Sequence, residues 1–254
     1  MVKKVPYIHE DQIERNAAAL LAEYAQARDV TIEPPVPIDN IVEKHLKLGI
    51  EFDDTHRLFG VPRSGLDPDI LGAMVFDERR VVIDESLDPE ENPSREGRYR
   101  FTLAHEGGHW RLHRHLFARD PAQVCLFSDP TPSAVICRSS QGKEPVEWQA
   151  DFYASCLLMP RKLIIAAWNE MFPDRRPRTM DRSRRAEIAM LANAEEREFE
   201  SKVEEWHNEQ TMEDFARPFA QRFLVSPQAM RIRLEKLRLL LREVPHQRML
   251  SSDT

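Results

Sequence analysis

Apolar residues recur at helical spacing near the start of the chain. Across residues 10–28 they lie three or four positions apart, as on one face of an amphipathic helix. The residues of this face are Ile13, Ala17, Leu20, Leu21 and Tyr24. A Pro-rich connector, EPPVPIDN, leads into a second predicted helix over about residues 38–47. The segment GIEFDD, residues 49–54, predicts a short strand.

Two apolar runs in the next part of the chain predict a β-hairpin. LGAMVF (71–76) and RVVIDES (80–86) are rich in β-formers and flank a short polar turn. A helix is predicted to begin near Asn92, with Pro93 in its first position. The segment VEWQADFYASCLLMP predicts a further helix over residues 146–158. Helices mixed with a small antiparallel sheet predict an α+β fold.

The C-terminal third is predicted to be helical and strongly charged. An Arg-rich linker, residues 173–185, precedes a helical region over residues 186–245. Near its end, Ser226 and Pro227 fit the N-cap and first position of a helix. That helix carries four basic residues: Arg231, Arg233, Lys236 and Arg238. The unit is compatible with a DNA-binding helix-turn-helix, but a helical hairpin that packs on the rest of the chain is favoured.

Composition narrows the class of protein. The 254 residues are 41% hydrophobic and 31% charged, which is typical of a globular chain. The net charge of -7 argues against a general nucleic-acid binder. No apolar run approaches a membrane span, and no secretory signal is visible. Three cysteines without Cys-x-x-Cys spacing predict free thiols in a cytoplasmic protein.

The sharpest chemical feature is the pentapeptide that begins at His105. His105 and His109 are four positions apart, so on a helix both imidazoles lie on one face and can reach one ion. Glu106 lies next to the first histidine, where it can hold a water molecule against the metal. The pattern is that of a zinc peptidase, whose metal takes three protein ligands and leaves one position open.

Two candidates compete for the third ligand. The first is His115, at the spacing used by metzincins, but that pattern needs glycine at position 112 and this chain has Leu112. The second is a pair of carboxylates on the next long helix, Glu147 and Asp151, four positions apart. One of them can bind the ion, and the other can accept a hydrogen bond from a zinc histidine.

The segments RFTLAHEGGHWRLH and EWQADFYASCLLMP together resemble the paired signature of the ImmA/IrrE family of zinc metallopeptidases. The resemblance implies that His105, His109 and Glu147 bind Zn²⁺ and that Glu106 is the general base. It also implies that Asp151 accepts a hydrogen bond from a zinc-binding histidine. It also implies a zincin-like metallopeptidase domain over residues 5–172, with two metal-binding helices and a helical C-terminal extension. Asp151 departs from the family, where asparagine is more usual.

The resemblance further implies an endopeptidase that hydrolyses a protein substrate with a zinc-activated water. In this family the usual substrate is a helix-turn-helix transcriptional repressor, often one that guards a mobile element or a stress regulon. Tyr153 and His113 are candidates to stabilise the oxyanion, although His113 is better explained as packing beside the site. An extended substrate is expected to add to the exposed edge of the hairpin at residues 71–85.

Two other functions stay open at this point. One is a non-catalytic zinc-binding regulator whose C-terminal unit binds DNA or a protein partner. The other is a component of a toxin or defence system. Glu106 favours the enzyme, because a structural zinc site needs no base.

Two adjacent glycines lie inside the metal-binding helix, where each costs about 1 kcal/mol relative to alanine. Gly108 matches the family, and we expect another backbone element to pack close to it. Gly107 replaces a residue that is usually bulky and apolar. For Gly107 the hypothesis is extra room beside Glu106, in which case leucine there would stabilise the helix.

Overall fold

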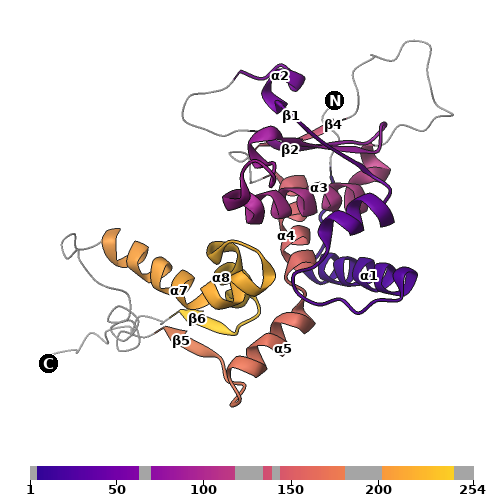
Figure 1. Ribbon diagram of the computed structural model, residues 1–254. Coiled ribbons are helices and arrows are strands. Elements are labelled where there is room, and N and C mark those ends of the chain that lie inside the picture. The colour runs from indigo at the N-terminus through magenta and orange to yellow at the C-terminus, as the bar shows by residue number, and fades with distance from the viewer. Residues whose placement is uncertain (1–4, 63–69, 118–133, 139–143, 181–201, 243–254) are drawn as a thin grey trace, which may run out of the picture. The chain divides into compact units, whose positions relative to one another are not determined.

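The computed structural model describes residues 5–62, 70–117, 134–138, 144–180 and 202–242 (Figure 1). The chain divides into two compact units. The first contains Met1–Ile165 with Gln221–Ser226, and the second contains Ala166–Ala220 with Pro227–Thr254. The domain limits expected from the sequence stay a prediction.

A four-stranded sheet in the first unit has the order β1-β3-β2-β4. The strands are β1 (Gly49–Asp53), β2 (Ile70–Val75), β3 (Arg80–Asp84) and β4 (Ala134–Arg138). The predicted hairpin is confirmed, since β2 and β3 pair antiparallel. The expectation of a purely antiparallel sheet is wrong, because β3 inserts beside β1 and pairs with it in parallel. The sheet is therefore mixed.

Both edges of the hairpin are occupied within the part of the chain that the structure describes. Strand β1 pairs with β3, and β4 pairs antiparallel with β2. The expectation that a substrate adds to an exposed hairpin edge is therefore wrong. An incoming strand would have to add to β1 or β4, which are the edges of the sheet, or displace one of them.

The helices of this unit follow the apolar patterns closely. They are α1 (Glu10–Arg28), the π-helix η1 (Asn40–His45), α2 (Thr55–Phe59), the 3₁₀ turns η2 (Glu85–Leu87) and η3 (Pro93–Arg95), α3 (Glu96–Phe117), α4 (Pro145–Leu158) and the start of α5 (Arg161–Met171). The apolar face predicted for α1 is buried. The helix expected over residues 38–47 is present, but most of it is π-helical. The short helix α2 is absent from the sequence prediction.

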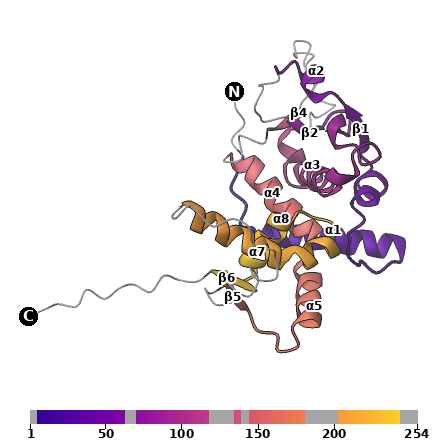
Figure 2. The ribbon, with the colours of Figure 1, turned by 60° about the vertical axis from the view of Figure 1, so that its left-hand side comes forward.

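Helix α3 lies between the sheet and α4, as Figures 1 and 2 both show. Its buried residues include Leu103 and Ala104, and β3 contributes Val81 and Val82 to the core. Burial of each large aliphatic side chain stabilises the fold by about 1.5–3 kcal/mol. Helix α1 covers α4 from another side. This packing holds α3 and α4 in register, which is what a site built from both helices requires.

The second unit is built on an aromatic cluster. It contains the end of α5, α7 (Lys202–Phe223, which ends in the first unit), α8 (Pro227–Lys236) and the parallel pair β5 (Arg178–Met180) and β6 (Leu240–Arg242). Trp168 stacks on Phe219 with ring centroids 5.6 Å apart, and Phe172 stacks on Phe215 at 5.9 Å. Strand β5 falls in the predicted linker. Most of the charged helix predicted over residues 186–210 lies outside the described residues.

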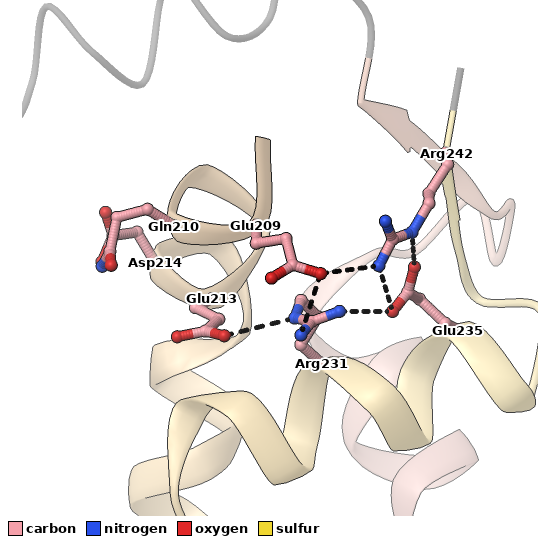
Figure 3. Close-up of polar contacts among 7 residues, drawn as sticks. All are labelled: Glu209, Gln210, Glu213, Asp214, Arg231, Glu235 and Arg242. Carbon is pink, nitrogen blue, oxygen red and sulfur yellow. Dashed lines mark hydrogen bonds and ion pairs between the residues drawn. The ribbon is translucent and has the colours of Figure 1, made fainter. Parts of the chain in front are cut away.

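A buried arginine ties α8 to α7 in the second unit (Figure 3). Arg231 is 4% exposed and contacts Glu213 at 3.3 Å, Glu235 at 2.9 Å and Glu209 at 3.6 Å. Arg233 on the same helix is 1% exposed. Two of the four basic residues that suggested DNA binding are thus buried in the fold, so they are not available to contact phosphates from this conformation.

Candidate metal centre

Helices α3 and α4 bring three side chains to one point. The Nε2 atoms of His105 and His109 lie 2.9 Å apart. Glu147 Oε2 lies 3.2 Å from His105 Nε2, and Glu147 Oε1 lies 3.5 Å from His109 Nε2. All three side chains are buried, and one ligand atom of each lies within 4.8 Å of the others. The two histidines come from one face of α3, whereas Glu147 comes from a different helix.

The arrangement fits a divalent metal ion. Tetrahedral zinc with bonds of about 2.0–2.1 Å holds its ligand atoms about 3.3–3.4 Å apart, close to the separations observed here. The donor set of two imidazole nitrogens and one carboxylate is that of catalytic zinc sites, which keep a fourth position open. Both Nε2 atoms also face a carboxylate, so neutral imidazoles without a proton there would direct three lone pairs at one another. A cation between the three groups removes that repulsion.

The outer nitrogen of His105 has a carboxylate partner. Asp151 Oδ1 lies 2.8 Å from His105 Nδ1, one turn beyond Glu147 on α4. The carboxylate accepts a hydrogen bond from the protonated Nδ1, so the Nε2 lone pair is directed at the ion site. Aspartate at position 151 thus supplies the oxygen acceptor that the ligand histidine needs.

The outer nitrogen of His109 faces His113 instead. The two Nδ1 atoms lie 3.1 Å apart, and His113 Nε2 lies 2.9 Å from Gln149 Oε1. His113 is therefore behind His109, away from the ion site, so it is no candidate for stabilising an oxyanion there. Gln149 was not among the site residues predicted from the sequence. The available signal was a polar residue between Glu147 and Ala150 on the buried face of α4.

Glu106 is the group poised to accept a proton. It is fully buried, and neither carboxylate oxygen has a hydrogen-bond partner among the residues that the structure describes. Its neighbour is Gly72 on β2, where an added Cβ would lie 2.8 Å from Glu106 Oε1 and 2.7 Å from Thr102 Cγ2. Glycine at position 72 thus leaves the space that the carboxylate occupies.

Burial and charge set the protonation of these groups in the metal-free protein. Burial, together with the charges of Glu147 and Asp151, raises the pKa of Glu106 to about 8. Burial lowers the pKa of His109 to about 4, so the ring is neutral at physiological pH, as a metal ligand must be. Burial would raise the pKa of Glu147, but the adjacent His105 and His109 hold it below its ordinary value.

The metal-free protein offers a test of the Glu106 environment. The raised pKa means that Glu106 keeps its proton in the folded state up to about pH 8, whereas the unfolded chain releases it near pH 4.5. The free energy of unfolding therefore falls as pH rises from about 4.5 to 8. Glutamine does not titrate, so Glu106→Gln abolishes this fall in stability. We expect the variant to gain stability over the native chain between pH 5 and pH 8 by a few kcal/mol, since one pKa unit is worth about 1.4 kcal/mol. Denaturant unfolding in the presence of a chelator, at pH 5 and at pH 8, gives the unfolding free energies of both proteins. A difference between variant and native chain that is the same at both pH values would contradict the prediction.

Tyr153 and His115 are the remaining candidates from the sequence. Tyr153 is fully buried, and its side chain packs against α3 beside Gly108. His115 is exposed, and α3 continues through Phe117 without a turn at Leu112. The metzincin alternative therefore has no support in the geometry.

The adjacent glycines of α3 have different neighbours. An added Cβ at Gly108 would lie 3.1 Å from Tyr153 Cδ1 and 3.3 Å from the carbonyl oxygen of Ala150 on α4. The close approach expected there is thus present. At Gly107 the nearest atoms belong to Val42, at 3.6 Å, and Leu46, at 4.0 Å. The room beside Gly107 faces these residues and not Glu106, so the hypothesis of space for Glu106 is wrong.

The two glycines make a matched pair for mutation. Gly107→Ala should stabilise the protein by about 0.5–1 kcal/mol, because the methyl group fits and the helix gains propensity. Gly108→Ala should destabilise it by about 1–3 kcal/mol, because the methyl group meets backbone of α4. Leucine at position 107 would press on Val42 and Leu46, contrary to the expectation from sequence. Thermal unfolding of the two alanine variants measures the contrast, and shifts of the same sign would contradict it.

Paired helices that present His-Glu-x-x-His and a downstream glutamate define a metallopeptidase of the zincin type. Residues 78–191, which include α3 and α4, match the Peptidase_M78 family, described as the IrrE N-terminal-like domain. This part of the chain is accordingly a metallopeptidase domain of the Peptidase_M78 type with an intact His-His-Glu triad. A comparison with curated proteins finds no match. No helix among the described residues is both long and apolar enough to span a membrane.

Proposed function

We propose that this chain is a zinc-dependent endopeptidase that cleaves a helix-turn-helix transcriptional repressor. The observation that carries the catalytic part is the position of Glu106. Its carboxylate is buried, has no hydrogen-bond partner in the described part of the chain, and lies on the same helix as His105 and His109. A structural metal site has no use for such a group, and burying a carboxylate without a partner is costly.

A zinc ion at the triad would supply Lewis acidity and lower the pKa of a water molecule at its open position. Glu106 accepts the proton of that water, since both of its oxygens are free of other hydrogen bonds. The same carboxylate then returns the proton to the leaving amine of the substrate. Asp151 and His113 hold the outer nitrogens of the two histidines, so neither ring rotates during the reaction.

The repressor is proposed as substrate on the basis of the ImmA/IrrE resemblance. Cleavage would relieve repression of a stress regulon or a mobile element. A reducing cytoplasm, where such a repressor acts, agrees with three cysteines that lack Cys-x-x-Cys spacing. The rival proposal, a DNA-binding regulator, depends on basic residues of α8, of which Arg231 and Arg233 are buried.

The test is to incubate the zinc-loaded chain with the helix-turn-helix repressor encoded nearest to its gene. We expect cleavage at one or a few bonds, loss of cleavage with a chelator, and recovery when zinc is restored. Intact repressor in the presence of bound zinc would refute the substrate, and failure on unfolded casein as well would refute the endopeptidase. Retardation of duplex DNA that weakens steeply with salt would instead support the regulator.

A further inference from the structure

Gln149 lies behind the metal centre and is bonded on both sides of its amide. Its Oε1 lies 2.9 Å from His113 Nε2, and its Nε2 donates to the carbonyl oxygen of Pro6 over 2.9 Å. Gln149 and His113 are both fully buried. A buried amide that contacts a group able only to accept must turn its nitrogen toward that group, which fixes its orientation.

The direction of each hydrogen bond follows from the carbonyl of Pro6. A carbonyl oxygen can only accept, so the amide nitrogen of Gln149 must face it and Oε1 must face His113. His113 Nε2 must then carry a proton to donate. A neutral imidazole with its proton on Nε2 holds a lone pair on Nδ1.

The lone pair on His113 Nδ1 determines the state of His109. The two Nδ1 atoms are 3.1 Å apart, and one of them must donate to the other. Because His113 can only accept there, His109 carries its proton on Nδ1 and presents a bare Nε2 to the ion site. His105 reaches the same state through Asp151, but by a charged partner from a partly exposed position.

We propose that Gln149 is a positioning residue for the metal: through His113, and held by the Pro6 carbonyl, it selects the ring tautomer in which His109 can bind the ion. The inference rests on the proposed metal site but not on any substrate. It also ties the segment before α1 to the metal centre, because Pro6 supplies the acceptor that orients the amide.

Two variants distinguish this hydrogen-bond relay, which runs from Gln149 through His113 to His109, from a simple packing role of Gln149. Gln149→Met keeps the volume and removes both hydrogen bonds, so we expect zinc affinity to fall about 10–100-fold, as for other partners of ligand histidines. Gln149→Glu keeps an acceptor for His113 and loses the amide donor to Pro6, so zinc affinity should fall less than in Gln149→Met. If Gln149 acted only by tethering Pro6, both variants would lose affinity equally, and the proposal would be wrong.

The affinity is measured on the full chain by competition with a chromogenic chelator, with Gln210→Met as the control. Gln210 is exposed on α7, and its amide bonds Asp214 at 3.4 Å, so that variant should bind zinc as the native chain does. Unfolding of each metal-free variant shows whether it is folded.

A second measurement needs no variant. Long-range ¹H–¹⁵N spectra of the zinc-loaded native protein should show His113 protonated on Nε2, and the reverse tautomer would overturn the proposal even if Gln149→Met does not fold. Both readouts are independent of cleavage. A protein with the expected tautomer and zinc affinity that cleaves nothing would refute the proposed function and leave the relay intact.

Discussion

Replacing Glu106 with glutamine is expected to slow peptide hydrolysis by about 10²–10⁴-fold while the protein keeps its zinc. Glutamine has nearly the same shape, so it fits the space beside Gly72, but it cannot accept the proton from the attacking water. The three metal ligands are unchanged. Initial rates on the repressor, measured alongside bound zinc by atomic absorption, give both quantities from one sample.

The control for Glu106→Gln is Glu144→Gln, which makes the same chemical change at an exposed residue before α4. Its rate should equal that of the native chain. Full activity in the zinc-loaded Glu106→Gln variant would show that another group takes the proton, and the role assigned to Glu106 would be wrong.

Replacing Glu147 with alanine removes a metal ligand itself. Zinc binding is therefore expected to weaken by more than the 10–100-fold that is typical of losing a hydrogen-bond partner of a ligand histidine. Two histidines would remain, and the charge that offsets the cation would be gone. Hydrolysis should disappear with the metal and return only partly at high zinc concentration. Chelator competition and rates at increasing zinc measure these effects.

His115→Ala is the matched control for the ligand assignment. His115 is exposed on the last turn of α3, so its loss should leave zinc affinity unchanged. The opposite result, in which Glu147→Ala keeps zinc and His115→Ala loses it, would restore the metzincin arrangement despite Leu112.

Local patterns in the sequence were sufficient to predict much of this fold. The apolar spacing in α1, the turn between β2 and β3, and the prolines near the starts of α3 and α4 are signals carried within a few residues. The same holds for His105 and His109, whose shared face follows from helical geometry alone. Placing Glu147 beside them needed the family resemblance, because the two helices are separated by a long segment.

Features that depend on distant partners were not predictable in this way. The parallel pairing of β1 with β3 depends on where the hairpin docks, and β4 has no strong alternating pattern. The contact of Gly107 with Val42 depends on how η1 packs. The orientation of Gln149 depends on a carbonyl 143 positions away along the chain. In each case the deciding partner is remote in sequence.

The close approach of Gly72 to Glu106 gives a criterion for sorting related chains by whether they are active. A larger side chain at position 72 would displace the end of the Glu106 side chain, because an added Cβ falls 2.8 Å from its oxygen. A relative that keeps both metal histidines but has a bulky residue on this strand is therefore expected to bind metal without cutting peptides. One strand position, more than thirty residues before the signature pentapeptide but in contact with it in the fold, would therefore separate metal binders from peptidases.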